Sequence, residues 1–309
     1  MAVYTDVSFE ELDRFLQSYD VGAARSFKGI AEGVENTNFH LQTDRGSYVL
    51  TLYEKRVSAD DLPFFLNLMH YLAERGIACP QPVSNREGER WAGLNGKPAA
   101  LLTFLDGVSL RRPEASHCAQ AGKALAKLHR AGSDFSGGRQ NALAPEGWRK
   151  LAAETQTNAD TVQAGLAVLI QSTIGELDAW PSGLPLGIIH ADLFPDNVLF
   201  LNGEISGLID FYFACNDAYA YDLAVMLNAW CFETDGSFNI TKGTALLSGY
   251  SQNRELSNAE IDALPLLAQG AALRFLLTRR DDWVHPDPSA FVRPKDPREF
   301  AKRLRFHRN

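Results

Sequence analysis

One loop of this sequence holds polar residues at a spacing that suits catalysis. His190, Asp192 and Asn197 lie in the stretch HADLFPDN, directly after the apolar run LPLGII. Another acidic residue, Asp210, follows the segments VLFL and EISGLI. Carboxylate and amide oxygens are ligands that a hard cation such as Mg²⁺ prefers, and that cation also binds phosphate oxygens. The residue types therefore indicate phosphoryl transfer, in which one carboxylate stays free to deprotonate an attacking hydroxyl.

The spacing gives each of these residues a role. His-x-Asp-x-x-x-x-Asn is the pattern of the kinase catalytic loop, and a later Asp-Phe begins the metal-binding motif that accompanies it. On this pattern Asp192 is the catalytic base and His190 supports the loop backbone. Asn197 and Asp210 are then the Mg²⁺ ligands. Tyr212 replaces the Gly of Asp-Phe-Gly, which disfavours a protein kinase.

The turn Asn202-Gly203 explains how these residues could meet. Asn-Gly between two apolar runs is a strong hairpin signal, because both central residues adopt positive φ. If the two residues that flank the turn pair with each other, Asn197 lies opposite Leu208. Asp210 is then about two residues, or roughly 7 Å, further along. Both predicted ligands emerge at the end of the hairpin that the loop of Asp192 also reaches.

Blander interpretations of the same residues stay open. A His-x-Asp pair alone also fits a polar turn in which the Asp caps a helix. A transition-metal hydrolase would need more His or Cys ligands than this stretch offers. Asp222, in the stretch YDLA, is more typical of a helix cap or a loop brace than of a metal ligand.

Composition limits the classes of partner. The 309 residues include 38 acidic and 30 basic side chains, and the resulting net charge of −8 disfavours binding to nucleic acid. The first residues have no basic segment before an apolar one, and no run of roughly 18 apolar residues occurs, so we expect a cytoplasmic protein without a membrane span. Residues 299–309 are basic, and we expect them to form a solvated helix. The four cysteines are far apart and lack a C-x-x-C pair, which predicts buried free thiols.

The surrounding elements divide the chain into two parts. Up to residue 105 the pattern is a helix capped at Ser8, a hairpin, another helix and a hairpin around Asn95-Gly96. From residue 106 onward the pattern is mainly helical, with a long loop over residues 133–147. We therefore expect an α+β, bilobal fold, with a small antiparallel-sheet N-terminal lobe and a mainly helical C-terminal lobe.

Further stretches between residues 33 and 283 point to a family. They are GVENTNFHLQT, YVLTLYE, LLTFLDG, GIIHADLFPDNVLF, GLIDFYFA, AYDLAVMLNAWCFE and RFLLTRRDDW. Together they resemble the type II homoserine kinases of the aminoglycoside phosphotransferase and choline kinase-like superfamily. The resemblance implies a protein kinase-like fold with ATP and Mg²⁺ between a nucleotide-binding lobe, residues 1–105, and a catalytic and substrate-binding lobe, residues 106–309. It also implies phosphorylation of the side-chain hydroxyl of L-homoserine to O-phospho-L-homoserine in threonine biosynthesis.

The same resemblance assigns nucleotide contacts to a phosphate loop and to a hinge that meets adenine. The matching residues are Gly33, Asn36, Thr37, Asn38, Leu102, Thr103, Phe104 and Leu105. One position departs from the pattern, because Thr51 stands where kinase-like folds commonly have a phosphate-binding Lys or Arg. Lys55 and Arg56 are possible substitutes. An inactive kinase-like binding module is the alternative that this departure raises.

The acceptor pocket has several candidate residues. Homoserine is a zwitterion, so its pocket needs a cation for the carboxylate and an acceptor for the ammonium group. Arg274, Arg279 and Arg280 are candidates for the first task, and Asp217 and Asp282 for the second. A kinase of another small amino alcohol, or of an aminoglycoside, is the alternative within the enzyme class.

Overall fold

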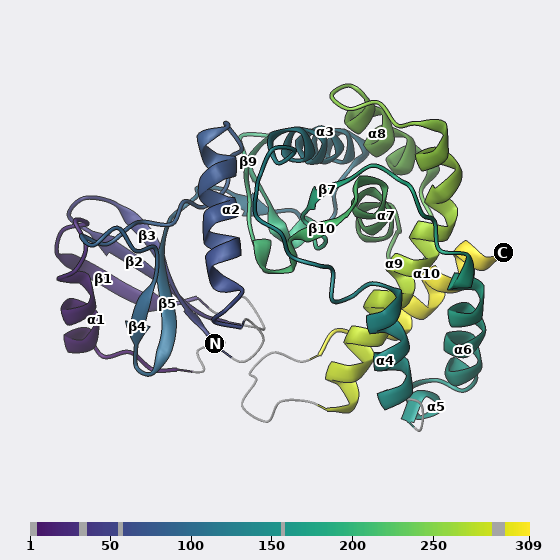
Figure 1. The fold of residues 1–309 in the computed structure, drawn as a ribbon, viewed down its shortest axis with the longest axis horizontal. Coiled ribbons are helices and arrows are strands. Elements are labelled where there is room, and N and C mark those ends of the chain that lie inside the picture. Colours follow the sequence, from purple (N-terminus) through teal and green to yellow (C-terminus); the bar gives the residue numbers. More distant parts are fainter. Residues whose placement is uncertain (1–4, 31–35, 55–57, 156–157, 286–293) are drawn as a thin grey trace. The chain divides into compact units, whose positions relative to one another are not determined.

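The chain folds into two compact units. The computed structural model describes residues 5–30, 36–54, 58–155, 158–285 and 294–309 (Figure 1). Described residues 5–106 form the first unit, and 107–285 with 294–309 form the second. The first unit contains α1 (Phe9–Leu16), β1 (Ala24–Gly29), β2 (Asn36–Thr43), β3 (Ser47–Tyr53), α2 (Leu62–Glu74), β4 (Ala92–Leu94) and β5 (Lys97–Thr103).

The second unit is mainly helical. Its helices are α3 (Ala115–Ala131), α4 (Pro145–Thr155), α5 (Ala159–Val162), α6 (Leu166–Glu176), α7 (Tyr219–Trp230), α8 (Ile240–Ser251), α9 (Asn258–Val284) and α10 (Arg298–Arg308), with the 3₁₀ turns η2 (Leu177–Ala179), η3 (Pro195–Asn197) and η4 (Phe211–Phe213). Its strands are β6 (Val108–Ser109), β7 (Leu186–Ile189), β8 (Val198–Leu201), β9 (Glu204–Leu208) and β10 (Cys215–Ala218).

An antiparallel sheet with the strand order β1-β2-β3-β5-β4 forms the first unit. The hairpin between β4 and β5 forms as predicted, since Asn95 and Gly96 have φ values of 50° and 73°. The sequence does not predict β1. Its segment ARSFKG lacks a clear apolar alternation, and β1 lies at the edge of the sheet with no fully buried residue.

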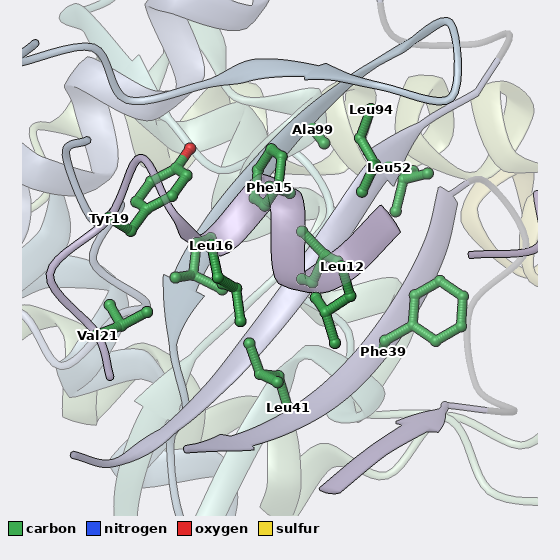
Figure 2. Close-up of a cluster of buried hydrophobic side chains, with 12 residues drawn as sticks. Leu12, Phe15, Leu16, Tyr19, Val21, Phe39, Leu41, Leu52, Leu94 and Ala99 are labelled. Carbon is green, nitrogen blue, oxygen red and sulfur yellow. The ribbon is translucent and has the colours of Figure 1, made fainter. Parts of the chain in front are cut away.

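Helix α1 covers this sheet. The predicted capping box is present, because the Ser8 N–H donates to Glu11 Oε2 at 2.7 Å and the Glu11 N–H donates to Ser8 Oγ at 3.2 Å. Figure 2 shows the buried cluster that α1 forms with the sheet, and its labelled members are Leu12, Phe15, Leu16, Tyr19, Val21, Phe39, Leu41, Leu52, Leu94 and Ala99. Each large apolar side chain buried here contributes roughly 1.5–3 kcal/mol to folding.

Helix α9 lies at the centre of the second unit. Helices α7 and α10 pack against it, and α3 packs against α8 (Figure 1). By length and composition alone α9 could cross a membrane, but 72% of its most apolar window is buried inside the protein, as in the core helix of a soluble domain. The expectation of a solvated helix over residues 299–309 is wrong for one face of α10, because Phe300, Ala301 and Leu304 are fully buried.

Two further local expectations have clear outcomes. The loop expected over residues 133–147 is shorter, because α4 begins at Pro145, whose fixed φ suits a first helical turn.

All four cysteines are buried and free, as predicted. Burial raises the pKa of Cys79 and of Cys215 to about 12, so these thiols stay protonated.

Candidate active site

The predicted hairpin lies directly behind the HADLFPDN loop. Asn202 and Gly203 have φ values of 53° and 83°, and the flanking residues Leu201 and Glu204 pair as expected. Strands β8 and β9 belong to a three-stranded sheet with β6. The Asn202-Gly203 turn therefore sets the start of the hairpin strands, and the loop that contains Asp192 ends where β8 begins.

A β-bulge at Ser206 shifts the register predicted further along. The extra residue in β9 places Asn197 beside Ile209 and not opposite Leu208. The Ile209 N–H donates to the main-chain carbonyl of Asn197 at 3.0 Å. Asp210 therefore lies one residue beyond the neighbour of Asn197, where the sequence predicted two. The correction arises because a bulge inserts a residue that the turn signal does not reveal.

Asn197 and Asp192 meet within the loop. The Asn197 side-chain amide donates to the Asp192 carbonyl oxygen at 2.8 Å and to Asp192 Oδ2 at 3.2 Å. These bonds fix the rotation of both side chains. The amide oxygen of Asn197 accepts no hydrogen bond from the described residues, so it remains available as a ligand.

Asp210 has an unusual backbone conformation. Its φ of 66° and ψ of 62° are left-handed, which costs a non-glycine residue on the order of 1 kcal/mol, although Asp tolerates this region better than most. The turn sends the next residue, Phe211, into the core, where its ring centroid lies 4.8 Å from that of His190. Strain of this kind is typical of functional sites.

Asp222, on α7, braces the HADLFPDN loop. Its Oδ2 accepts the His190 N–H at 2.7 Å, and its Oδ1 accepts the Ala191 N–H at 2.8 Å. His129 Nε2 donates to the same carboxylate at 3.1 Å, and His129 Nδ1 accepts the Tyr250 hydroxyl at 2.8 Å. Of the two roles the sequence suggested for Asp222, cap or brace, the structure therefore shows the brace.

Burial and hydrogen bonding set the charges in this brace. Burial alone would raise the pKa of Asp222, but the hydrogen bonds and charges around it outweigh burial and hold the pKa below its usual value. Burial lowers the pKa of His129 and of His190. Asp222 is therefore ionised and is held by the neutral imidazole of His129 and by the backbone N–H groups of His190 and Ala191.

Three further side-chain hydrogen bonds tie the loop to the rest of the second unit. His190 Nε2 donates to the Ile209 carbonyl at 3.0 Å, and Trp230 Nε1 donates to the Leu193 carbonyl at 2.8 Å. Arg274 donates to the carbonyl of Ala191, a residue with a left-handed φ of 62°. The sequence placed Arg274 among the acceptor-binding candidates but gave no sign of its contact with the loop.

The predicted phosphate loop belongs to the first unit. Asn36, Thr37 and Asn38 begin β2, whereas Gly33, Lys55 and Arg56 lie outside the described residues. Thr37 Oγ1 donates to Glu54 Oε1 at 2.8 Å. Thr51, at the position expected for a basic residue, is buried and donates to Asn38 Oδ1 at 2.7 Å. The Thr37 and Asn38 side chains thus brace the sheet.

The predicted hinge, Leu102, Thr103, Phe104 and Leu105, follows from the end of β5. The Thr103 N–H donates to the Gln81 carbonyl at 2.9 Å, and the Phe104 N–H donates to the Ser47 carbonyl at 3.2 Å. Among the described residues Leu105 makes no hydrogen bond. Its backbone groups are therefore available to a ligand at the end of this segment.

The donor set of the second unit fits magnesium. Asn197 offers an amide oxygen, and Asp210 offers a partly exposed carboxylate one residue past the contact that links the two segments. Such oxygens suit a cation that keeps several waters and binds phosphate oxygens. No group of three or more His, Cys, Asp or Glu that could hold a metal occurs within the described residues, so the transition-metal alternative gains no support from them.

An antiparallel-sheet unit, followed by a helical unit with this loop and this strained Asp-Phe turn, defines a kinase-like phosphotransferase. The chain belongs to the phosphotransferase enzyme family, whose model matches residues 26–256. It is similar to the homoserine kinase of Xanthobacter autotrophicus, with 61% identity over 99% of this chain and 96% of that protein. It is also similar to the homoserine kinase of Rhizobium meliloti, with 59% identity over 100% of this chain and 95% of that protein.

A solved structure confirms the fold. The structure of a spectinomycin phosphotransferase in complex with ADP and spectinomycin matches 96% of this chain and 95% of its own, with a TM-score of 0.72 and 15% identity. The predicted fold class is confirmed, as is the resemblance to homoserine kinases of the phosphotransferase family.

Proposed function

We propose that this chain transfers the γ-phosphoryl group of MgATP to the side-chain hydroxyl of L-homoserine, which forms O-phospho-L-homoserine and ADP for threonine biosynthesis. The observation that supports it best is the identity of about 60% with curated homoserine kinases along the whole chain. The chain is an ATP-using kinase of a small molecule. An aminoglycoside or another amino alcohol as acceptor is not favoured by these relatives.

Asp192 is the general base in this proposal. It takes the proton from the homoserine hydroxyl as that oxygen bonds to the γ-phosphorus and the bond to ADP breaks. The hydrogen bond from Asn197 at 3.2 Å holds the carboxylate in one rotation. The brace at Asp222 fixes the backbone that carries it.

Asn197 and Asp210 would hold the Mg²⁺ ion. When bound, Mg²⁺ neutralises charge on the phosphate oxygens. Residues 1–105 act as the nucleotide-binding lobe, with the segments 33–38 and 102–105 toward the phosphates and adenine. Residues 106–309 act as the catalytic and substrate-binding lobe. We expect the enzyme in the cytoplasm.

An acceptor panel tests the proposal. ADP release with MgATP is measured over homoserine, choline, methylthioribose, hydroxylysine and an aminoglycoside. Homoserine should give the highest kcat/KM, and phosphorus NMR should show a phosphate monoester on its side-chain oxygen. Equal or better turnover of another acceptor would overturn the assignment, and an absence of turnover and of stabilisation by MgATP would favour the inactive module.

A further inference from the structure

Three buried polar atoms of the second unit lack hydrogen-bond partners within the described residues. They are Trp148 Nε1 on α4, Tyr221 Oη on α7 and Arg274 Nε on α9. Each of the three side chains is only 1% exposed. Buried polar groups are normally hydrogen-bonded, so three unpartnered ones close together need a specific explanation.

The three side chains form one cluster. The Trp148 and Tyr221 rings lie 6.2 Å apart, and Trp180 lies against both, at 5.0 Å and 5.9 Å between ring centroids. A Cβ added at Gly270 would lie 2.5 Å from Trp180 and 2.9 Å from Trp148, so α9 approaches these rings closely. Arg274 lies one turn after Gly270 and thus shares its face of α9.

Charge of both signs reaches this cluster. Burial raises the pKa of the Tyr221 hydroxyl, the charge and hydrogen-bonding groups of the nearby Arg274 oppose that rise, and Asp217 adds to it. The hydroxyl is therefore within electrostatic reach of one cation and one carboxylate. Asp217 is partly exposed, and its Oδ2 accepts the Asn141 side-chain amide at 2.7 Å.

Arg274 also links the cluster to the reacting group. It donates to the carbonyl of Ala191, the residue before Asp192. Among the other candidate cations, Arg279 pairs with Glu299. Arg280 is buried and lacks a hydrogen bond within the described residues, but no contact ties it to the catalytic loop.

We infer that Trp148, Tyr221 and Arg274 form the subsite for the carboxylate of the acceptor, with Asp217 as the acceptor for its ammonium group. The inference rests on the proposed function and adds the residues that select an amino acid over a simple amino alcohol. The carboxylate accepts hydrogen bonds from the three unpartnered donors. Because Arg274 contacts the residue beside Asp192, a short acceptor anchored there directs its hydroxyl toward the base.

Removal of the Tyr221 hydroxyl tests this subsite with little change in volume. The kcat/KM values for homoserine and for 3-aminopropan-1-ol, which lacks the carboxylate, are measured for the wild type, Tyr221→Phe and Trp148→Phe. We expect each variant to lower the homoserine value about ten-fold or more, mainly through KM. The value for 3-aminopropan-1-ol should stay near that of the wild type, so the preference for homoserine falls by the same factor.

Two comparisons sharpen the test. Tyr19→Phe removes another buried hydroxyl without a hydrogen bond, in the first unit, and should leave the preference unchanged. Homoserine should also raise the Tm of Tyr221→Phe less than that of the wild type. If the wild type does not phosphorylate homoserine, the proposed function is wrong.

A wild type that prefers homoserine, combined with an unchanged preference in Tyr221→Phe and Trp148→Phe, would overturn the subsite alone. Stabilisation of the free enzyme by Tyr221→Phe with unchanged kinetics would indicate a buried water in place of the carboxylate. A collapse of the preference in Arg280→Met but not in Tyr221→Phe would place the carboxylate at Arg280 and would equally overturn the inference.

Discussion

The side-chain amide of Asn197 donates a hydrogen bond to Asp192 Oδ2 over 3.2 Å. One amide thereby performs two tasks, because its nitrogen orients the proposed base while its oxygen remains available as a ligand. The four residues between the two positions are enough to close this contact only because η3 turns the chain back on itself.

Replacement of Asn197 should separate these two tasks. Asn197→Ala removes the amide oxygen and nitrogen together, so we expect a lower kcat, by roughly 10²-fold, and a higher Mg²⁺ concentration for half-maximal rate. Asn197→Asp keeps an oxygen ligand but loses the donor, so it should restore the Mg²⁺ response and leave kcat low. Titration of the rate with Mg²⁺ checks this, and an unchanged Mg²⁺ dependence in Asn197→Ala would contradict the ligand role.

Asp222→Asn should destabilise the protein and slow it. The substitution removes a buried charge that accepts three hydrogen bonds, and losses of this kind cost about 3–5 kcal/mol. Denaturant unfolding measures the loss, and kcat should fall more than either KM rises. Asp196→Asn is the matched control, because Asp196 lies in the same loop but its ion pair with Lys295 is exposed and worth at most about 1 kcal/mol. Equal stability of the two variants would rule out the brace.

Thr51→Val should weaken nucleotide binding. The substitution deletes the hydrogen bond to Asn38 but keeps the shape of a strand side chain, so we expect a two- to roughly ten-fold higher KM for ATP with the KM for homoserine unchanged. Thr43→Val removes the hydroxyl that donates to the Gly46 carbonyl and accepts the Arg45 and Gly46 N–H groups at a turn of the same sheet, and it serves as the control. If both variants keep the wild-type KM for ATP, Asn38 does not position the phosphates.

Acidification should destabilise the protein through the half-buried His307 and the buried His129 and His190. Burial, aided by the charge of Arg303, lowers the pKa of His307 to about 4. The unfolded state, with a pKa near 6.5, then binds more protons between about pH 6.5 and 4, so stability is lost as the pH falls through this window. At 1.36 kcal/mol for each pKa unit, His307 contributes up to roughly 3 kcal/mol of that loss.

His307→Gln tests this origin. Glutamine can still donate to Asn228 Oδ1, which His307 Nε2 contacts at 3.1 Å, but it does not titrate. The unfolding free energy of the variant should therefore depend less on pH between 6.5 and 4. Part of the dependence should remain, because the pKa values of His129 and His190 are also lowered by burial. A profile that overlays the wild type would exclude His307 as a source.

The sequence predicts the parts of the site that local chemistry determines. Asn202 and Gly203 favour a tight hairpin, and the spacing from Asp192 to Asn197 matches the catalytic-loop pattern of kinases. The bulge at Ser206 escapes prediction, because nothing in EISGL marks an unpaired residue. The bulge brings Asp210 one residue closer to Asn197 along the hairpin than the turn alone predicts.

Long-range contacts are the other part that the sequence hides. His129 and Asp222 are 93 residues apart, and His129 and Tyr250 are 121 apart, so no local pattern joins them. A histidine on the apolar face of a predicted helix is the one available signal, and it is weak. Packing of α3, α7 and α8 brings these three side chains together.

The rate of phosphohomoserine formation by Asp192→Asn tests the central claim most directly. Asparagine keeps the size of the side chain but cannot take a proton from the attacking hydroxyl. We predict that kcat falls by at least ~10²-fold, while the affinity for MgATP and the Tm stay close to those of the wild type. A variant that retains wild-type kcat would contradict the assignment of Asp192 as the base.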